Sequence, residues 1–175
     1  CLLGPNGAGK STTFKALSGL LALDAGTVRM LGRDVTRTGT EGLTALGAGF
    51  VPEGRRLFPS LSVRENLKLG YDASSCTSPF ETRLAMVCDM FPRVEERLTQ
   101  PARTMSGGEQ AMVALARALI GDPELLVMDE PSATLTDHEL ASLFTLIGEL
   151  RGRGMGILYI SHRLEEIFQI GDRAT

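Results

Sequence analysis

Short apolar runs alternate with helical patterns along the second half of the chain. LLVM (125–128) and GILYI (156–160) are continuously apolar, which is typical of strands buried on both faces. Three stretches with apolar residues at helical spacing flank these runs and predict helices. The first has Met112, Leu115, Ala116 and Leu119, the second has Leu140, Leu143, Phe144, Ile147 and Leu150, and the third is the segment 163–170. Strands that alternate with helices predict an α/β fold, with a mostly parallel sheet and helices on its faces.

The first half of the chain shows the same alternation less clearly. The expected elements are helices over 10–17, 61–69, 80–91 and 93–98, strands over 27–31 and 47–51, and a loop over 74–79. Gly19 suits the end of the first helix, because glycine readily takes the left-handed conformation found there. We also expect Asp137 to cap the helix that follows it.

Length, charge and cysteine content narrow the class of protein. The chain has 175 residues, of which 43% are hydrophobic, enough for one domain with a sizeable core. A net charge of −3 offers no basic surface, so no nucleic-acid partner is expected. Cys1, Cys76 and Cys88 lack CxxC spacing, which argues against a zinc site or a disulfide framework. No apolar run approaches the roughly 20 residues that span a bilayer, so any membrane role would come from docking to another protein.

A glycine-rich loop near the start carries the clearest chemistry. GPNGAGKS (4–11) matches the P-loop pattern, in which backbone N–H groups and a helix N-terminus surround phosphate. Lys10 would place a positive charge on the β- and γ-phosphates, and the Ser11 hydroxyl would bind Mg²⁺. The expected nucleotide-binding residues of this loop are Gly4, Pro5, Asn6, Gly7, Ala8, Gly9, Lys10, Ser11 and Thr12.

Two carboxylates follow the buried strand at 125–128. Asp129 stands at its carboxyl end, where parallel sheets bind ligands, and can hold Mg²⁺ directly or through water. Glu130 can orient or deprotonate an attacking water, although a structural salt bridge is the alternative. His162 follows the next buried strand and would face the same phosphate if the two strands are neighbours. His138 has no such placement, and we interpret it as an exposed helix residue.

The motifs together resemble one family. The P-loop, SGGE, LLVMDEP, SATLTD and ISH, in this order, look like the nucleotide-binding domain of an ABC ATPase. The resemblance implies a P-loop NTPase fold with a helical subdomain, at about 62–110, inserted in a domain that covers 1–175. It makes Ser106, Gly107, Gly108 and Glu109 the signature, 132–137 the D-loop, and His162 the switch histidine. In this family two domains pack head to tail, so the signature of one chain binds the phosphate held by the other.

Two features depart from the family pattern. Glu53 stands where the family usually has a Gln that touches the metal and the attacking water, so the expected metal ligands are Ser11, Glu53 and Asp129. The adenine-stacking aromatic of the family lies before the P-loop, where this chain has only three residues. We therefore expect the chain to be an internal portion of a larger domain, truncated at both ends.

The resemblance further implies an ATP-hydrolysing subunit of an importer on the cytoplasmic face of the membrane. Its expected partners are a second ATPase domain, transmembrane permease subunits and, indirectly, an external substrate-binding protein; its expected cofactors are ATP and Mg²⁺. VPEGRRLF and MFPRVEER resemble branched-chain amino-acid importers, which we favour, whereas the last third resembles sugar importers.

Other classes of ABC protein fit less well. Ser106 follows Lys10 by 96 positions, which leaves no room for the long coiled coil of chromosome and DNA-repair ATPases. The charged linker of two-domain translation proteins is not visible. The presence of Glu130 and His162 argues against a non-hydrolysing regulatory domain. A truncated fragment with weak or no activity stays an alternative.

Overall fold

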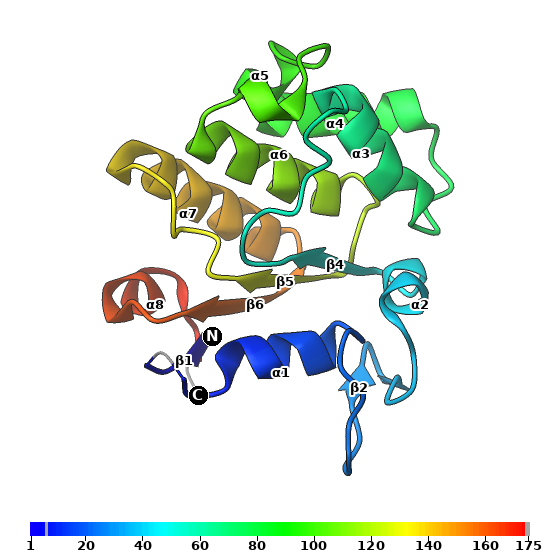
Figure 1. Ribbon diagram of the computed structural model, residues 1–175, viewed down its shortest axis with the longest axis vertical. Helices are drawn as coiled ribbons and strands as arrows, with labels where there is room; N and C mark the ends of the chain where they lie inside the picture. The colour runs from blue at the N-terminus through cyan, green and yellow to red at the C-terminus, as the bar shows by residue number, and fades with distance from the viewer. Residues whose placement is uncertain (6, 174–175) are drawn as a thin grey trace.

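A four-stranded parallel sheet forms the centre of the computed structural model, which describes residues 1–5 and 7–173 (Figure 1). Its strands, in the order β1–β6–β5–β4, are β1 (Leu2–Leu3), β6 (Gly156–Ser161), β5 (Leu125–Asp129) and β4 (Ala48–Val51). Each neighbouring pair runs parallel. The predicted fold class, a mostly parallel sheet flanked by helices, is confirmed.

Strand β5 is buried on both faces, as its apolar run predicts. Val127 packs toward α1 (Lys10–Leu17) in a cluster with Phe14 and Ile160. Leu126 and Met128 point the other way, into the largest core cluster. Helices α6 (Gly107–Leu119) and α7 (Asp137–Gly152) cover that second face (Figure 1). The sheet therefore separates the helix that follows the glycine loop from the helix that follows SGG.

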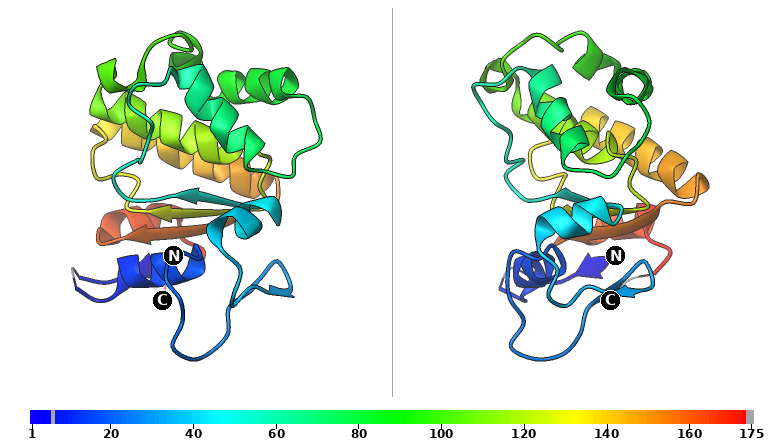
Figure 2. Two further views of the ribbon diagram at one scale, coloured as in Figure 1. Left: turned by 45° about the vertical axis from the view of Figure 1, so that its right-hand side comes forward. Right: turned by 90° about the vertical axis from the view of Figure 1, so that its right-hand side faces the viewer.

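Three α-helices and a 3-10 turn form a layer beyond α6, away from the sheet, as Figure 2 shows. This layer contains α3 (Val63–Asp72), α4 (Phe80–Met90), α5 (Pro92–Glu95) and a 3-10 turn (Ala102–Thr104). Val63, Leu67, Val87 and Val94 are fully buried and join this layer to the main core. Helix α8 (Leu164–Ile170) follows β6. The helices of this layer lie in the range where the sequence predicts a helical subdomain, at about 62–110, and the subdomain itself stays a prediction.

Asp137 does not cap the helix that follows it. Thr136 is the N-cap of α7, because its backbone N–H donates to the Glu139 carboxylate at 2.8 Å and its hydroxyl accepts from the Glu139 N–H. Thr-x-x-Glu is a capping-box pattern, which satisfies two free N–H groups reciprocally. Asp137 is instead the first helical residue, where a negative charge still favours the helix dipole.

Several other boundaries differ from those that the pattern predicts. The strand expected at 27–31 is shortened to β2 (Arg29–Met30), which forms an antiparallel hairpin with β3 (Arg33–Asp34) through Leu31 and Gly32 at positive φ. Helix α2 (Thr40–Ala45) was not expected, since six residues are too few for a clear periodicity. The helix expected over 93–98 is only α5. No helix among the described residues is long and apolar enough to cross a membrane.

Candidate functional site

The loop between β1 and α1 forms a cradle of backbone groups. Gly7 and Gly9 both have φ of 86°, in the left-handed region that glycine takes without strain. Gly9 is the N-cap of α1, and no side chain caps this helix. Its first N–H groups are therefore available to an anion. Ser11 and Thr12 lie in the first turn, while Asn6, also expected in the cradle, lies outside the described residues.

Lys10 places a positive charge within this cradle. Its side chain is buried, with 7% exposed, and its ammonium donates to the carbonyls of Gly4 at 2.9 Å and Pro5 at 3.1 Å. The Lys10 Nζ also lies 3.6 Å from Glu130 Oε1. The lysine thus links the loop to the carboxyl end of β5.

Glu130 and His162 meet at the ends of two adjacent strands. Strands β5 and β6 are neighbours, and the Nδ1 of His162 lies 2.8 Å from Glu130 Oε2. Glu130 has a φ of 48°, a conformation that costs a residue with a side chain roughly 1–2 kcal/mol. Such strain is concentrated at functional sites. The Glu130 carboxylate lies between Lys10 and His162.

Asp129 is a buried carboxylate surrounded by other acids. Its side chain is 3% exposed, and its Oδ1 has no hydrogen-bond partner. Burial raises the pKa of Asp129, and the nearby charges of Glu53 and Glu130 raise it further. A divalent cation would satisfy the orphaned oxygen and relieve the repulsion, so these residues fit Mg²⁺.

A metal ion would need more than these side chains. No group of three His, Cys, Asp or Glu side chains close enough to hold an ion occurs in the part of the chain that the structure describes. Mg²⁺ is commonly bound by one or two carboxylates together with waters and phosphate oxygens. Ser11 stands at the start of α1, and Glu53 is exposed in the loop after β4. Their roles as metal ligands beside a bound phosphate stay a prediction.

The signature residues lie on the other face of the sheet. Ser106 caps α6, since its N–H donates to Glu109 Oε2 at 2.8 Å and its hydroxyl accepts from the Glu109 N–H at 3.2 Å. Gly107 and Gly108 form the first turn. Among the described residues, no hydrogen bond or ion pair joins this turn to the glycine loop. A single chain therefore presents two separate helix starts to ligands.

Arginines connect the loop after β4 to the signature helix. Arg55 donates to the Gln110 side chain at 2.8 Å, and Arg117 donates to the carbonyls of Arg55 at 3.1 Å and Arg56 at 2.8 Å. Arg55 and Arg56 both have positive φ, at 63° and 46°. No pattern in the sequence indicates these contacts, because the partners are 55 to 62 positions apart. They tie the Glu53 loop to α6.

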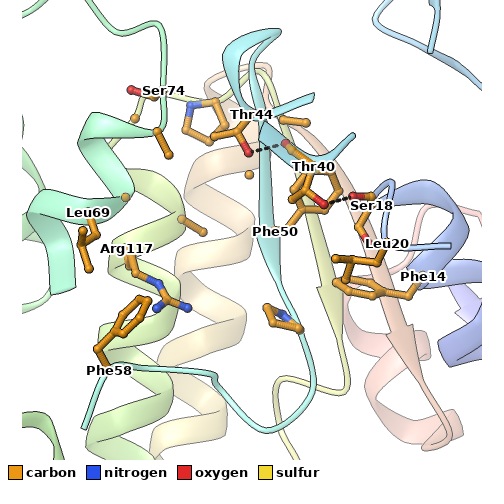
Figure 3. Close-up of a pocket in the computed structure, with 18 residues that line it drawn as sticks. Phe14, Ser18, Leu20, Thr40, Thr44, Phe50, Phe58, Leu69, Ser74 and Arg117 are labelled. Atoms are coloured by element: carbon orange, nitrogen blue, oxygen red, sulfur yellow. Dashed lines mark hydrogen bonds between the residues drawn. The ribbon is translucent and has the colours of Figure 1, made fainter. Parts of the chain in front are cut away.

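A mostly apolar groove lies beside this loop. Its volume is about 290 Å³, and it lies between α1, β4, α3 and α6 (Figure 3). Phe50, Phe58 and Leu69 supply apolar surface, and Arg117 points into it. Pro52, directly before Glu53, also lines the groove. The groove is therefore next to the Glu53 loop and outside the phosphate cradle.

The parallel sheet, the glycine loop and the acids after β5 define a P-loop nucleotide-binding fold. A sequence profile of the ABC transporter family matches residues 1–133. The chain belongs to the ABC transporter family. The resemblance inferred from the motifs is confirmed.

Two relatives illustrate the range of functions in the family. A protein of Burkholderia lata, named for the import of ribose, galactose and methyl galactoside, is 41% identical over 99% of this chain and 35% of its own length. The high-affinity branched-chain amino acid transport ATP-binding protein BraG of Pseudomonas aeruginosa is 36% identical over 99% of this chain and 74% of its own length. The chain thus spans about a third of the sugar relative.

A solved structure supports the fold. An ATP-binding cassette, crystallised as a dimer in a post-hydrolysis state with ADP and phosphate, has a TM-score of 0.86 with this chain. It is 25% identical, and the match covers 99% of this chain and 78% of that one.

Proposed function

We propose that this chain is the ATP-binding unit of an ABC importer and that it hydrolyses ATP. The observation that carries the proposal is the convergence of Lys10, Glu130 and His162 at the uncapped start of α1. The backbone N–H groups at this helix start can donate to phosphate, and Lys10 can balance the phosphate charge. Glu130 lies close to Lys10, where it can accept a proton from a water molecule. The domain assignment, 1–175 with a helical subdomain at about 62–110, is part of the same proposal.

The roles of the side chains follow from their placement. The N–H groups of the loop and Lys10 hold the phosphates, and Glu130 orients or deprotonates the water that attacks the γ-phosphorus. The bond between the γ-phosphorus and the bridging oxygen breaks, which releases ADP and phosphate. The hydrogen bond between His162 and Glu130 holds the carboxylate in place. Ser11, Glu53 and Asp129 would hold Mg²⁺, which neutralises the phosphate charge.

A second ATPase domain completes the site in this proposal. Ser106–Glu109 lies on the face of the sheet opposite the cradle of its own chain, which favours binding to the nucleotide of a partner chain. The related cassette was solved as a dimer, which supports the presence of a second domain. The groove beside the Glu53 loop is the place where permease subunits would dock, which sets the protein on the cytoplasmic face of the membrane. An external binding protein would act through the permease.

The transported substrate is proposed from the sequence similarity of this chain to importer proteins. We favour branched-chain amino acids, because VPEGRRLF and MFPRVEER match that importer type and BraG is similar over 74% of its length. Sugars are the alternative, supported by the higher identity to the Burkholderia relative. Deleting the gene in its host and measuring uptake of labelled leucine and ribose distinguishes the two, since only one uptake should fall.

Replacement of Glu130 tests the hydrolytic role. Glu130→Gln in the full-length protein should keep ATP binding while hydrolysis falls by about 10² or more, as for loss of a general base. Binding is measured with a fluorescent ATP analogue and hydrolysis by phosphate release. Glu149→Gln, an exposed change on α7, is the matched control and should alter neither. An unchanged rate of ATP hydrolysis in Glu130→Gln would contradict the assignment of Glu130 as the residue that activates water.

A further inference from the structure

A buried carboxylate that none of the proposed reacting groups includes lies next to the strand end that carries His162. Glu166 lies in the first turn of α8 and is 3% exposed. Buried carboxylates are rare unless they are paired or hydrogen-bonded, because burial removes their hydration. None of the roles assigned above uses Glu166.

Glu166 is bonded to the residues on both sides of His162. The Ser161 hydroxyl donates to Glu166 Oε2 at 2.8 Å, and the Arg163 guanidinium donates to Glu166 Oε1 at 3.2 Å. The Arg163 N–H also donates to the Ser161 hydroxyl at 3.0 Å. The backbone that carries His162 is therefore held at two points, although the imidazole itself is exposed.

The same carboxylate is tied to strand β6, to which the Glu130 backbone is also bonded. The Tyr159 hydroxyl donates to Glu166 Oε2 at 2.9 Å. Burial alone would raise the pKa of Glu166, but hydrogen bonds, including those from Ser161, Tyr159 and Arg163, hold it below its usual value. On the same strand, the Ile160 carbonyl accepts from the Glu130 backbone N–H at 2.9 Å. Glu166 thus holds the strand end that carries His162 and that bonds to the Glu130 backbone.

We infer that Glu166 is a positioning residue that sets the distance and orientation between Glu130 and His162. This inference rests on the proposed ATP hydrolysis. Glu166 touches neither reacting group, and it acts by holding Tyr159, Ser161 and Arg163 on one carboxylate. Because these three side chains all donate to it, an amide in its place would turn one of its own N–H groups toward a donor. The strained turn at Glu130 makes such an anchor necessary.

Kinetics of Glu166→Gln in the full-length protein test the inference. We expect kcat to fall about tenfold, the scale for a slight misplacement of catalytic groups, while the KM for ATP stays within about twofold. In a His162→Ala background the same change should alter kcat by less than about twofold, since the pair is already broken. Equal effects in both backgrounds, or a rise in KM that matches the fall in kcat, would overturn the inference.

Glu165→Gln is the matched control. Glu165 is the neighbouring acid on α8 and is exposed, so its replacement should leave kcat unchanged. Where Glu166→Gln fails to fold, Ser161→Ala removes one bond to the carboxylate and keeps its charge. The same dependence on His162 is expected for Ser161→Ala, and its absence counts against the inference.

A spectroscopic readout separates this inference from the proposed function. In protein labelled at histidine, Glu166→Gln should shift or broaden the imidazole NMR signals of His162 and leave those of exposed His138 unchanged. Unshifted His162 signals overturn the positioning role whatever the ATPase activity. Shifted signals in a wild-type protein that hydrolyses no ATP would support the positioning role and refute the proposed hydrolysis.

Discussion

Helices α1 and α6 both begin beside glycines, but their first turns are satisfied in different ways. At α1, Gly9 is the N-cap and no side chain accepts from the first N–H groups. At α6, Ser106 and Glu109 form a capping box that satisfies two N–H groups. An ion pair between Arg97 and Glu109 at 2.7 Å supports this box. The N-terminus of α1 therefore has no side-chain cap, whereas the N-terminus of α6 is capped by its own residues without a ligand.

The difference separates two ways of binding phosphate. At the start of α1, Lys10 lies beside N–H groups that no side chain caps. Most of these N–H groups would find their hydrogen-bond acceptor in the phosphates of the nucleotide. The capped start of α6 leaves only Gly107 and Gly108 with N–H groups that the box does not use. We expect the first start to supply most of the affinity and the second to complete a site formed by a partner chain.

The largest expected effect comes from mixing two damaged chains. Lys10→Ala damages the first helix start, and Ser106→Arg damages the second, so each full-length preparation alone should be nearly inactive. In a mixed dimer one composite site collects both lesions and the other is intact. Phosphate-release assays across mixing ratios should therefore show partial recovery of ATPase activity.

A crosslinking control establishes that the chains exchange partners. If the chains exchange partners but ATPase activity does not recover, there are two explanations. Either both sites must be intact for hydrolysis, or the two chains share no site. Measuring ATP occluded per mixed dimer separates these two cases, and zero occlusion would contradict the shared site.

The open start of α1 should depend on the conformation of Gly9. Gly9→Ala places a side chain at φ 86°, which costs roughly 1–2 kcal/mol and should weaken ATP binding about tenfold when the loop must hold this shape. Gly154→Ala is the matched control, because Gly154 has a φ of 88° and, like Gly9, open space around it. Isothermal titration should show normal affinity for Gly154→Ala; equal losses would mean that strain in general, and not the cradle, weakens binding.

The contact between Arg55 and Gln110 should matter for coupling more than for binding. Arg55→Ala removes a hydrogen bond worth about 1 kcal/mol between the Glu53 loop and α6. We expect ATP binding to stay normal and stimulation by the reconstituted permease to fall by about fivefold. Arg56→Ala, a change at the exposed neighbour whose carbonyl still accepts from Arg117, should keep the stimulation. Loss of basal binding alone would contradict a coupling role for this loop.

The cap of α6 should contribute least. Ser106→Ala should lower the free energy of unfolding by about 1 kcal/mol, the usual cost of losing a cap. Ser62→Ala is the matched control, because Ser62 and Glu65 form the same box at α3. Both changes should cost similar stability in urea titrations, and only Ser106→Ala should also lower ATPase activity. A larger activity loss in Ser62→Ala would argue against a special role for the second start.

Acid should remove the contribution of this cap. The hydrogen bond from the Ser106 backbone lowers the pKa of Glu109 below its ordinary value of 4.5, against the opposing effect of burial. A carboxyl group with a lowered folded-state pKa stabilises the protein above its unfolded pKa, and this stabilisation is lost as the pH falls through the folded value. The stability difference between wild type and Glu109→Gln should therefore be present at pH 7, begin to shrink as the pH falls below the ordinary value of 4.5, and vanish once the pH is below the folded-state pKa. A difference that persists in acid would contradict this origin.

Much of the fold could be predicted because its signals are local. The apolar run at 125–128 indicates a strand buried on both faces, and the glycine loop 4–11 indicates a phosphate cradle before a helix. Helix α2 and strand β3 were not predicted, and the strand expected over 27–31 is shortened to β2, since two to six residues carry no clear periodicity. The cap of α7 was misassigned to Asp137, because Thr-x-x-Glu and Asp compete for the same position and only the hydrogen bonds decide between them.

The sequence by itself determined the order of the motifs, the open start of α1 and the acids after β5, since each depends on residues that are consecutive or a few positions apart. Only the tertiary structure decided that Glu130 meets His162, that Arg55 bonds to Gln110, and that Glu166 bonds to the residues on both sides of His162. The first two contacts join residues that are distant along the chain, and they exist only because parallel strands end at one edge of the sheet and helices pack on its faces.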